Sequence, residues 1–325
     1  MFTRTLYDGF PRVHEGYRPF DIEMIRLDAT LDFTLYIDNA GQLAKYVQNG
    51  GTLQSVTKQR LLDNNVRYFY VSDAETSRFD DYLDSHLGAL LDAPGMDKAG
   101  KSRILYSACV HVMEELFESG ISGTRIAAAK ELMAETVNRI FNSEITAVSM
   151  LQLSSHDYRT YSHSVNVALY AVGIAHEYGL DSETVYEIAS GAMLHDVGKC
   201  HVALCILNKP GSLSLEEFEQ IREHPQMGYE VLLENGERNP RILDIVLNHH
   251  EKIDGSGYGR GLRAEAISFA TQVVTIADIF DALTSNRPYK RACNFYGALE
   301  KMKREMRPQL DMRIVDSLIR MMGRA

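Results

Sequence analysis

The spacing of apolar residues along the chain changes from strand-like to helix-like within its first third. Short apolar and aromatic runs between turn residues predict strands over Ile22–Leu27, Leu31–Ile37 and Val66–Ser72. A short helix is predicted between them, over Leu53–Asn64. This part of the chain therefore indicates a mixed α/β domain, to which we assign residues 1–85.

From about Asp80 the apolar positions recur at helical spacing. Breaks at Asp92–Gly95 and Ser119-Gly120 predict a helical connector over residues 86–153. Further helices are predicted over Ser164–Tyr178, Glu183–Leu194, a segment from the capping box Ser214/Glu217 towards His224-Pro225, Pro240–His249, Ala264–Ser285, Asn294–Arg304 and Met312–Met322. Residues 154–325 are thus predicted to be all-α, and the fold class is α+β overall, with a mixed α/β N-terminal domain followed by a helical domain.

The composition is that of an ordinary globular protein, with 325 residues of which 45% are hydrophobic and 24% charged. The 44 acidic and 34 basic side chains give a formal net charge of −10, which opposes non-specific binding to duplex nucleic acid or to an anionic membrane surface. No apolar run is long enough for a membrane span or a signal-peptide core. The four cysteines lack paired spacing, which indicates a reducing compartment. Together with the absence of a long apolar run, this predicts a cytoplasmic protein without membrane insertion.

Histidines are concentrated in one part of the chain, because eight of the 11 lie between residues 156 and 250. His195-Asp196 ends one predicted helix, and His249-His250 ends another before the glycine-rich turn Asp254–Gly261. Imidazole and carboxylate together favour a transition metal. Adjacent residues on a helix diverge by about 100°, so each doublet suits two metals lying side by side, which the Asp196 carboxylate can bridge.

Two further carboxylates lie in an apolar predicted helix, at Asp278 and Asp281. Their spacing places both on one helix face, where buried acids need a partner such as a metal. Each group alone is compatible with capping or hydrogen bonding, but a purely structural role for all of them would leave several polar groups unsatisfied. A zinc clip at Cys200, His201 and Cys205 lacks a second thiol pair. Gly198-Lys199 lacks the glycine-rich loop of a nucleotide-triphosphate site.

The order of these motifs resembles a known family, the HD-GYP domain. The matching residues are His163-Ser164, His195-Asp196-Val197-Gly198-Lys199, His224-Pro225, His249-His250-Glu251-Lys252-Ile253-Asp254-Gly255-Ser256-Gly257-Tyr258, Ala277-Asp278-Ile279-Phe280-Asp281-Ala282-Leu283 and Arg287-Pro288-Tyr289-Lys290. HD-GYP domains are a branch of the HD-superfamily metal-dependent phosphohydrolases, and their members hydrolyse the bacterial second messenger cyclic di-GMP. The resemblance runs from near Ser154 to near Ala292, and it implies an HD-type fold for the helical domain.

The resemblance also implies roles for individual residues. Asp196 and Lys199 would be catalytic, with Lys199 beside the scissile phosphate. Tyr258, Asp281, Arg287 and Lys290 would contact the dinucleotide. The metal ligands would be His163, His195, Asp196, His224, His249, His250 and Asp278, around divalent iron or manganese.

The sequence departs from the family pattern at two positions that affect these expectations. The signature Gly-Tyr-Pro is Gly257-Tyr258-Gly259 here, which puts the rigidity of the loop in question. The subgroup with three metals carries a glutamate four residues before the first histidine, where this chain has Arg159. We therefore expect two metal ions.

The implied activity is hydrolysis of cyclic di-GMP to linear pGpG, with a second cleavage giving GMP. Water activated between two cations would attack phosphorus, and Lys199 would be a candidate proton donor to the leaving oxygen. Two alternatives remain open, namely hydrolysis of another cyclic dinucleotide or nucleoside phosphate, and a nucleotide-binding module that signals through partners such as diguanylate cyclase (GGDEF) domains. The N-terminal domain would regulate the protein, join it into a homodimer, or be structurally inert.

Overall fold

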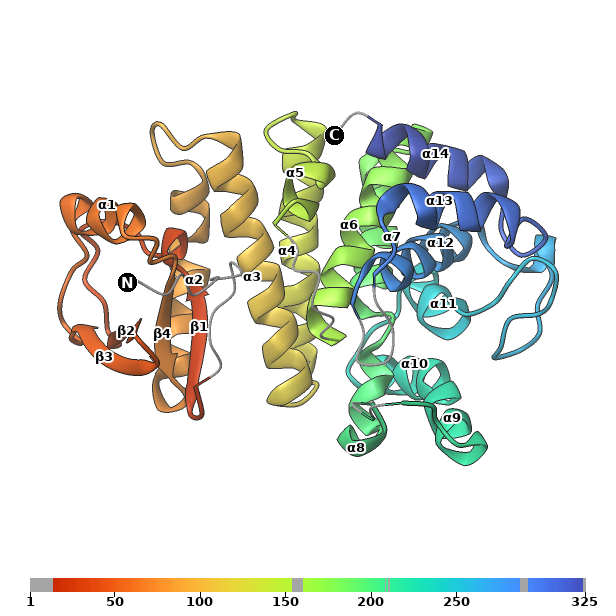
Figure 1. Ribbon diagram of the computed structural model, residues 1–325, viewed down its shortest axis with the longest axis horizontal. Helices are drawn as coiled ribbons and strands as arrows, with labels where there is room; N and C mark the ends of the chain where they lie inside the picture. Colours follow the sequence, from red (N-terminus) through yellow and green to blue (C-terminus); the bar gives the residue numbers. More distant parts are fainter. Residues whose placement is uncertain (1–13, 154–159, 208, 210, 287–291, 324–325) are drawn as a thin grey trace, which may run out of the picture. The chain divides into compact units, whose positions relative to one another are not determined.

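The chain divides into two compact units, residues 1–108 and residues 109–325 (Figure 1). The computed structural model describes residues 14–153, 160–207, 209, 211–286 and 292–323. The three-part division at residues 85 and 153 remains a prediction.

The N-terminal unit is built on a four-stranded antiparallel sheet in the order β1-β4-β2-β3. Its elements are β1 (Tyr17–Asp21), η1 (Ile22–Met24), β2 (Leu35–Asn39), β3 (Gln42–Val47), α1 (Ser55–Asp63), β4 (Tyr68–Ser72), η2 (Asp73–Glu75) and α2 (Thr76–Leu91), where η denotes a 3₁₀ turn. Helix α3 (Lys98–Glu118) begins in this unit and ends in the next. Phe79 of α2 lies 4.1 Å from Phe20 and 5.4 Å from Phe33 between ring centroids, and all three rings are buried.

The prediction of a strand over Ile22–Leu27 was wrong, since the first strand ends at Asp21 and a 3₁₀ turn follows it. The Asp21 carboxylate accepts a hydrogen bond from the backbone N–H of Glu23, which favours a turn over further extension. The second strand begins at Leu35, four residues later than predicted. Leu31 and Phe33 are fully buried, so they are apolar because they fill the core and not because they belong to a strand.

Strand β3 was not predicted because its side chains are mostly exposed, as befits a strand at the sheet edge. The turn that precedes it lies at Ala40-Gly41, where both residues have positive φ, at 55° and 94°. Two successive residues of positive φ match the right-handed twist of a tight hairpin. Asp38 and Asn39, although typical turn residues, therefore form the end of β2.

The named secondary-structure elements among the described residues of the C-terminal unit are helices and 3₁₀ turns. In chain order these are α4 (Gly123–Phe141), α5 (Ala147–Leu151), α6 (Thr160–Tyr178), α7 (Ser182–Leu194), η3 (Val197–His201), α8 (Leu204–Leu207), α9 (Leu215–Arg222), α10 (His224–Glu234), α11 (Pro240–Asn248), η4 (Ala264–Ala266), α12 (Phe269–Thr284), α13 (Phe295–Arg304) and α14 (Met312–Met322). The α+β fold class is confirmed.

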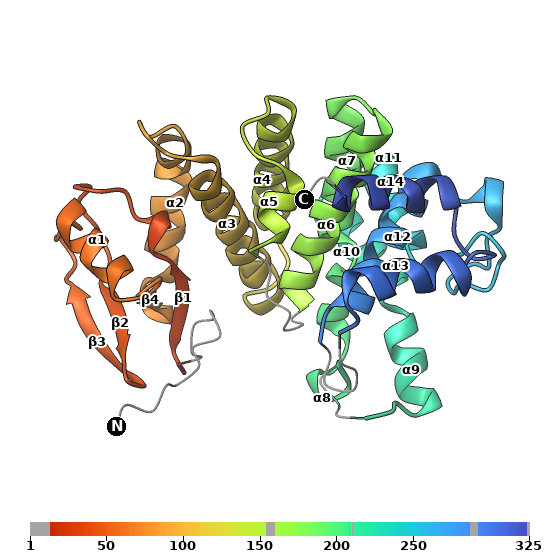
Figure 2. The same cartoon turned by 45° about the horizontal axis from the view of Figure 1, so that its top comes forward.

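Helix α6 is the centre of this unit, because every residue from Ser162 to Ala175 is buried. It packs against α5, α7, α12 and α14, and α7 in turn packs against α4 and α11. In both ribbon views α8 and α9 project beyond the other helices of the unit (Figure 2). The ends of α7 and α11 and the faces of α6 and α12 therefore meet inside the helical core.

Local capping signals explain where several of these helices begin. The predicted box at Ser214 and Glu217 is present, with each side chain accepting from the other's backbone N–H. Asp181 caps α7 by accepting from the N–H of Thr184. The predicted helix Ala264–Ser285 is shorter, since Ser268 caps α12 and residues 264–266 form a separate 3₁₀ turn.

Candidate metal centre

Five helices bring the predicted ligand residues together. His163 comes from α6, His195 and Asp196 follow α7, His224 is the first residue of α10, His249 and His250 follow α11, and Asp278 lies on α12. The five side chains His163, His195, Asp196, His224 and His249 are each at most 2% exposed. Polar groups buried this deeply require partners of opposite charge or hydrogen bonds.

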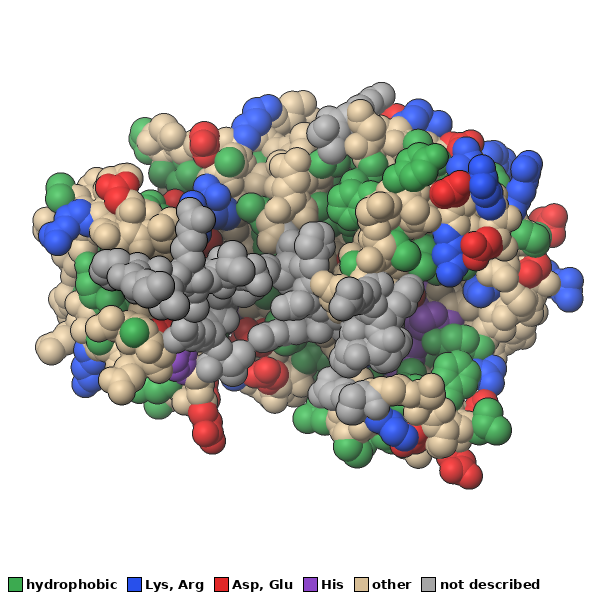
Figure 3. Space-filling model, in the orientation of Figure 1, with side chains coloured by type: hydrophobic (Ala, Val, Ile, Leu, Met, Phe, Trp, Pro, Cys, Tyr) green, Lys and Arg blue, Asp and Glu red, His purple; other side chains and the backbone are tan. Residues whose placement is uncertain are grey.

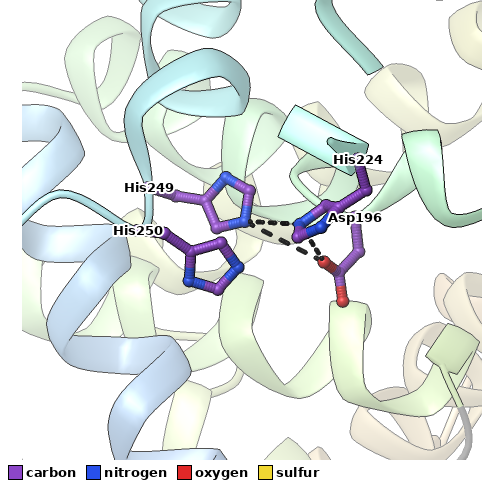
Figure 4. A group of neighbouring side chains, drawn as sticks. All are labelled: Asp196, His224, His249 and His250. Carbon is purple, nitrogen blue, oxygen red and sulfur yellow. Dashed lines mark hydrogen bonds and ion pairs between the residues drawn. The ribbon is translucent and has the colours of Figure 1, made fainter. Parts of the chain in front are cut away.

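Two overlapping groups of donor atoms form this cluster, and Asp196 belongs to both. One group contains Asp196, His224, His249 and His250, as Figure 4 shows, and the other contains His163, His195 and Asp196. Within each group the donor atoms lie within 4.8 Å of one another. This arrangement suits two neighbouring cations that share one carboxylate.

Backbone carbonyls set the orientation of three of these rings. Nδ1 of His195, His224 and His249 lies 2.6, 2.6 and 2.9 Å from the carbonyl oxygens of Ala192, Ile221 and Val246. Since a carbonyl oxygen only accepts, these contacts assign the ring proton to Nδ1 and leave a lone pair on Nε2. This is the tautomer that a metal-binding histidine adopts.

Three atoms inside the cluster receive no hydrogen bond. Nε2 of His195, Nε2 of His250 and Oδ1 of Asp196 are buried without a hydrogen-bond partner. Oδ1 of Asp196 lies 3.2 Å from Nε2 of His224, which presents a lone pair to it. Acceptors facing acceptors in a buried site fit a cation among them, and their nitrogen and oxygen chemistry suits iron, manganese or zinc.

A second layer of contacts orients His163. Its Nδ1 donates to Oδ2 of Asp281 at 2.6 Å, and Asn166 donates to Oδ1 of the same carboxylate at 3.2 Å. Nε2 of His163 then faces Asp278, 3.1 Å from Oδ1. Asp281 is 2% exposed and orients the His163 ring through this contact, while its predicted contact to the dinucleotide stays a prediction.

The electrostatics of the cluster favour the protonation states that metals require. Burial holds the pKa of His249 well below its usual range, and the neighbouring His250 acts in the same direction. Burial likewise holds the pKa of His250 well below its usual range. For Asp196, burial opposes ionisation, but the neighbouring His195 and Lys199 hold its pKa well below the ordinary value. The imidazoles of His249 and His250 are thus neutral beside an ionised Asp196 carboxylate.

Lys199 lies at the outer side of the cluster, where its Nζ contacts Oδ2 of Asp196 at 2.5 Å. Its side chain is 14% exposed, whereas that of Asp196 is inaccessible. The ammonium therefore compensates the buried carboxylate from the side closer to solvent.

A loop after α11 carries Gly257-Tyr258-Gly259. Tyr258 stacks on His250, with ring centroids 4.3 Å apart and an interplanar angle of 27°. The buried carboxylate of Glu251 accepts hydrogen bonds from the backbone N–H groups of Arg260 and Leu262. Gly259 has a φ of +119°, which a proline with φ near −65° cannot adopt. Glu251 therefore ties the loop without help from a proline.

The sequence analysis missed two residues that orient parts of the site. Asn166 and Glu251 were not singled out, although a polar Asn166 one helical turn after His163 on an apolar helix was an available signal. Arg287, Lys290 and Arg159 lie outside the described residues.

Comparison with known proteins agrees with this geometry. A family described as an HD domain matches residues 146–314. The cyclic di-GMP phosphodiesterase PA4108 of Pseudomonas aeruginosa is 33% identical over 222 residues, which are 68% of this chain and 53% of that protein. The 3′3′-cGAMP-specific phosphodiesterase 1 of Vibrio cholerae is 34% identical over 182 residues, covering 54% and 42% of the two chains. The chain thus spans about half the length of these relatives or less.

A solved structure shares the fold over nearly the whole chain. Bd1817, a HDG"Y"P protein from Bdellovibrio bacteriovorus, has a TM-score of 0.70 at 21% identity and covers 94% of this chain and 99% of its own. At this identity the likeness concerns the fold alone. Among the described residues, no helix is both long and apolar enough to cross a bilayer.

Proposed function

The chain belongs to the HD domain family, and from this premise we propose that it is a metal-dependent phosphodiesterase of cyclic dinucleotides, with cyclic di-GMP as the first candidate substrate. The observation that carries the proposal is the pair of donor groups that share Asp196. A mononuclear structural site would need only one such group. The relatives that carry this activity by name support the same reaction class.

Each donor group would hold one cation. His163 and His195 would bind one ion and His224, His249 and His250 the other, with Asp196 common to both. Oδ1 of Asp278 lies 3.1 Å from Nε2 of His163, and its Oδ2 lies 3.7 Å from Nδ1 of His250. Asp278 thus contacts one residue of each donor group. When bound, the ions would lower the pKa of a coordinated water and neutralise charge on a phosphate.

The protein's own residues would supply orientation and a proton. Asp281 keeps His163 in the Nδ1-protonated form and turns Nε2 inward. Lys199 contacts Asp196 and is partly exposed to solvent, and it would deliver a proton to the leaving ribose oxygen. Tyr258, stacked on His250, would border the substrate. Arg287 and Lys290 remain proposed contacts to the phosphates.

A second candidate substrate is 3′3′-cGAMP, because a relative of similar identity is named for it. The two substrates differ in one base and share the phosphodiester ring. The metal centre acts on the phosphate and cannot distinguish them, so the choice depends on residues that contact the bases.

The test is chromatography of the products after anaerobic incubation of iron- or manganese-loaded protein with each dinucleotide. Asp196→Ala removes the shared carboxylate, and Asp316→Ala, an exposed aspartate of α14, is the matched control. We expect pGpG or GMP from cyclic di-GMP with the wild type and the control, and none with Asp196→Ala.

The outcomes separate the alternatives. Faster cleavage of 3′3′-cGAMP would assign that substrate instead. Absence of product from metal-loaded wild type would contradict a hydrolase and favour a nucleotide-binding module.

A further inference from the structure

Side chains of α9 extend the ring stack that begins at the metal centre. Tyr258 stacks on His250, and Cζ of Arg222 lies 5.3 Å from the Tyr258 ring centroid. The same Cζ lies 6.0 Å from the ring centroid of Phe218, which is 6.4 Å from that of Tyr258. Two aromatic rings and a guanidinium thus form one surface that starts at a predicted metal ligand.

The fold does not need Phe218 for its core. Helix α9 contains no buried residue, and Phe218 is 44% exposed. The helix projects beyond the other helices of its unit in both ribbon views. Figure 3 shows histidine side chains on this face with hydrophobic side chains directly beside them. The Phe218 ring is therefore accessible to a ligand beside the candidate active site.

Arg222 also has donors to offer. Its Nη1 forms an exposed ion pair with Oε1 of Glu219 at 2.8 Å. Exposed pairs of this kind contribute little to stability, and a guanidinium carries five N–H donors, of which this contact engages one. The group is held against two rings, which orients its planar fork.

We propose that Phe218 and Arg222 form the base-binding wall of the site, with Phe218 stacking on a purine and Arg222 donating to its acceptor edge. This inference rests on the proposed cyclic dinucleotide substrate. Guanine presents two acceptors, O6 and N7, to a bidentate guanidinium, whereas adenine presents one acceptor and one donor. Arg222 therefore favours guanine over adenine, which makes it the specificity-determining residue between the two candidate substrates.

The test measures KM, kcat and calorimetric binding for cyclic di-GMP, 3′3′-cGAMP and cyclic di-AMP with the metal-loaded full chain. Phe218→Ala should raise KM for all three by about 10–100-fold, and Phe218→Tyr should restore it, because stacking needs a ring and accepts any base. Arg222→Gln should reduce the preference for guanine by about tenfold or more. Leu215→Ala, which removes another exposed apolar side chain of α9, is the control and should change neither constant.

Failure of this inference differs from failure of the proposed function. Suppose that the wild type cleaves a dinucleotide, and that Phe218→Ala and Arg222→Gln have the same KM and base preference as the wild type. This result would overturn the base-binding wall but not the proposed function, and would leave α9 as a surface for a protein partner. Binding that depends on Phe218 without any cleavage would support the wall and contradict hydrolysis. If the wild type neither binds nor cleaves any of the three dinucleotides, both the base-binding wall and the proposed function are wrong.

Discussion

Nε2 of His224 and Nε2 of His249 lie 3.2 Å apart, although each ring donates a hydrogen bond from Nδ1 to a backbone carbonyl and so has a lone pair on Nε2. Two nitrogen lone pairs at this distance repel each other unless a cation lies beside them. Both rings are buried, so water does not relieve the repulsion. The contact thus supports a metal ion more directly than the residue types alone.

Metal binding should stabilise the protein. Manganese at about 100 times its dissociation constant should raise the unfolding midpoint of the wild type by about 5–10 °C. His249→Gln should abolish most of this shift, while His176→Gln, an exposed histidine outside the cluster, should keep it. Scanning calorimetry with and without chelator measures the effect, and an equal shift in His249→Gln would contradict the assignment.

Removing the charge behind His163 should weaken the centre without removing a ligand. In Asp281→Asn the amide cannot accept from both His163 and Asn166, so the His163 tautomer is lost. We expect metal affinity and kcat to fall by about 10–100-fold. Ser285→Ala deletes a longer contact of 3.2 Å to the same carboxylate and should change them little. Metal titration measures both variants, and unchanged affinity in Asp281→Asn would exclude the positioning role.

Replacing Gly259 with proline should harm this loop. Gly259→Pro cannot keep the φ of +119°, so Tyr258 should leave its stack on His250. Even in Gly259→Ala the new Cβ would lie 3.2 Å from Oε1 of Glu251. We expect KM for the substrate to rise by about 5–100-fold, equivalent to 1–3 kcal/mol of strain. Gly261→Asn, at a site of positive φ with open space, is the control, and a proline variant with wild-type KM would refute the argument.

Acid should remove the stabilisation that Glu237 contributes. Burial opposes its ionisation, but Lys130, 2.6 Å away, and the backbone N–H groups of Arg238 and Asn239 lower its pKa below 4.5. A lowered folded-state pKa stabilises the protein above the unfolded-state value, and the contribution disappears as pH falls through the folded-state value.

Glu237→Gln should therefore cost about 1–3 kcal/mol at pH 7 and progressively less below about pH 4.5. Urea unfolding at several pH values measures the difference. Glu234→Gln, at an exposed position of α10, should show no such trend. A cost for Glu237→Gln that stays constant down to pH 3 would count against this linkage.

The sequence by itself determined the helical domain, most helix ends and the donor types of the site. Caps such as Asp181 and Ser214 act within three residues, so local sequence encodes them. The doublet His195-Asp196 and the pair of aspartates on α12 likewise revealed their chemistry through short spacing. Strand β3 was missed because an edge strand buries too little to show apolar alternation.

Only the tertiary structure decided how these groups meet. The contact between His163 and Asp281 joins residues 118 positions apart, and it arises from the packing of α6 against α12. That packing places the Asp281 carboxylate against Nδ1 of His163. The φ of Gly259 and the stack of Phe218 and Arg222 beside Tyr258 also depend on neighbours distant in sequence. Local periodicity carries no information about such approaches, because they are set by the joint packing of elements far apart in the chain.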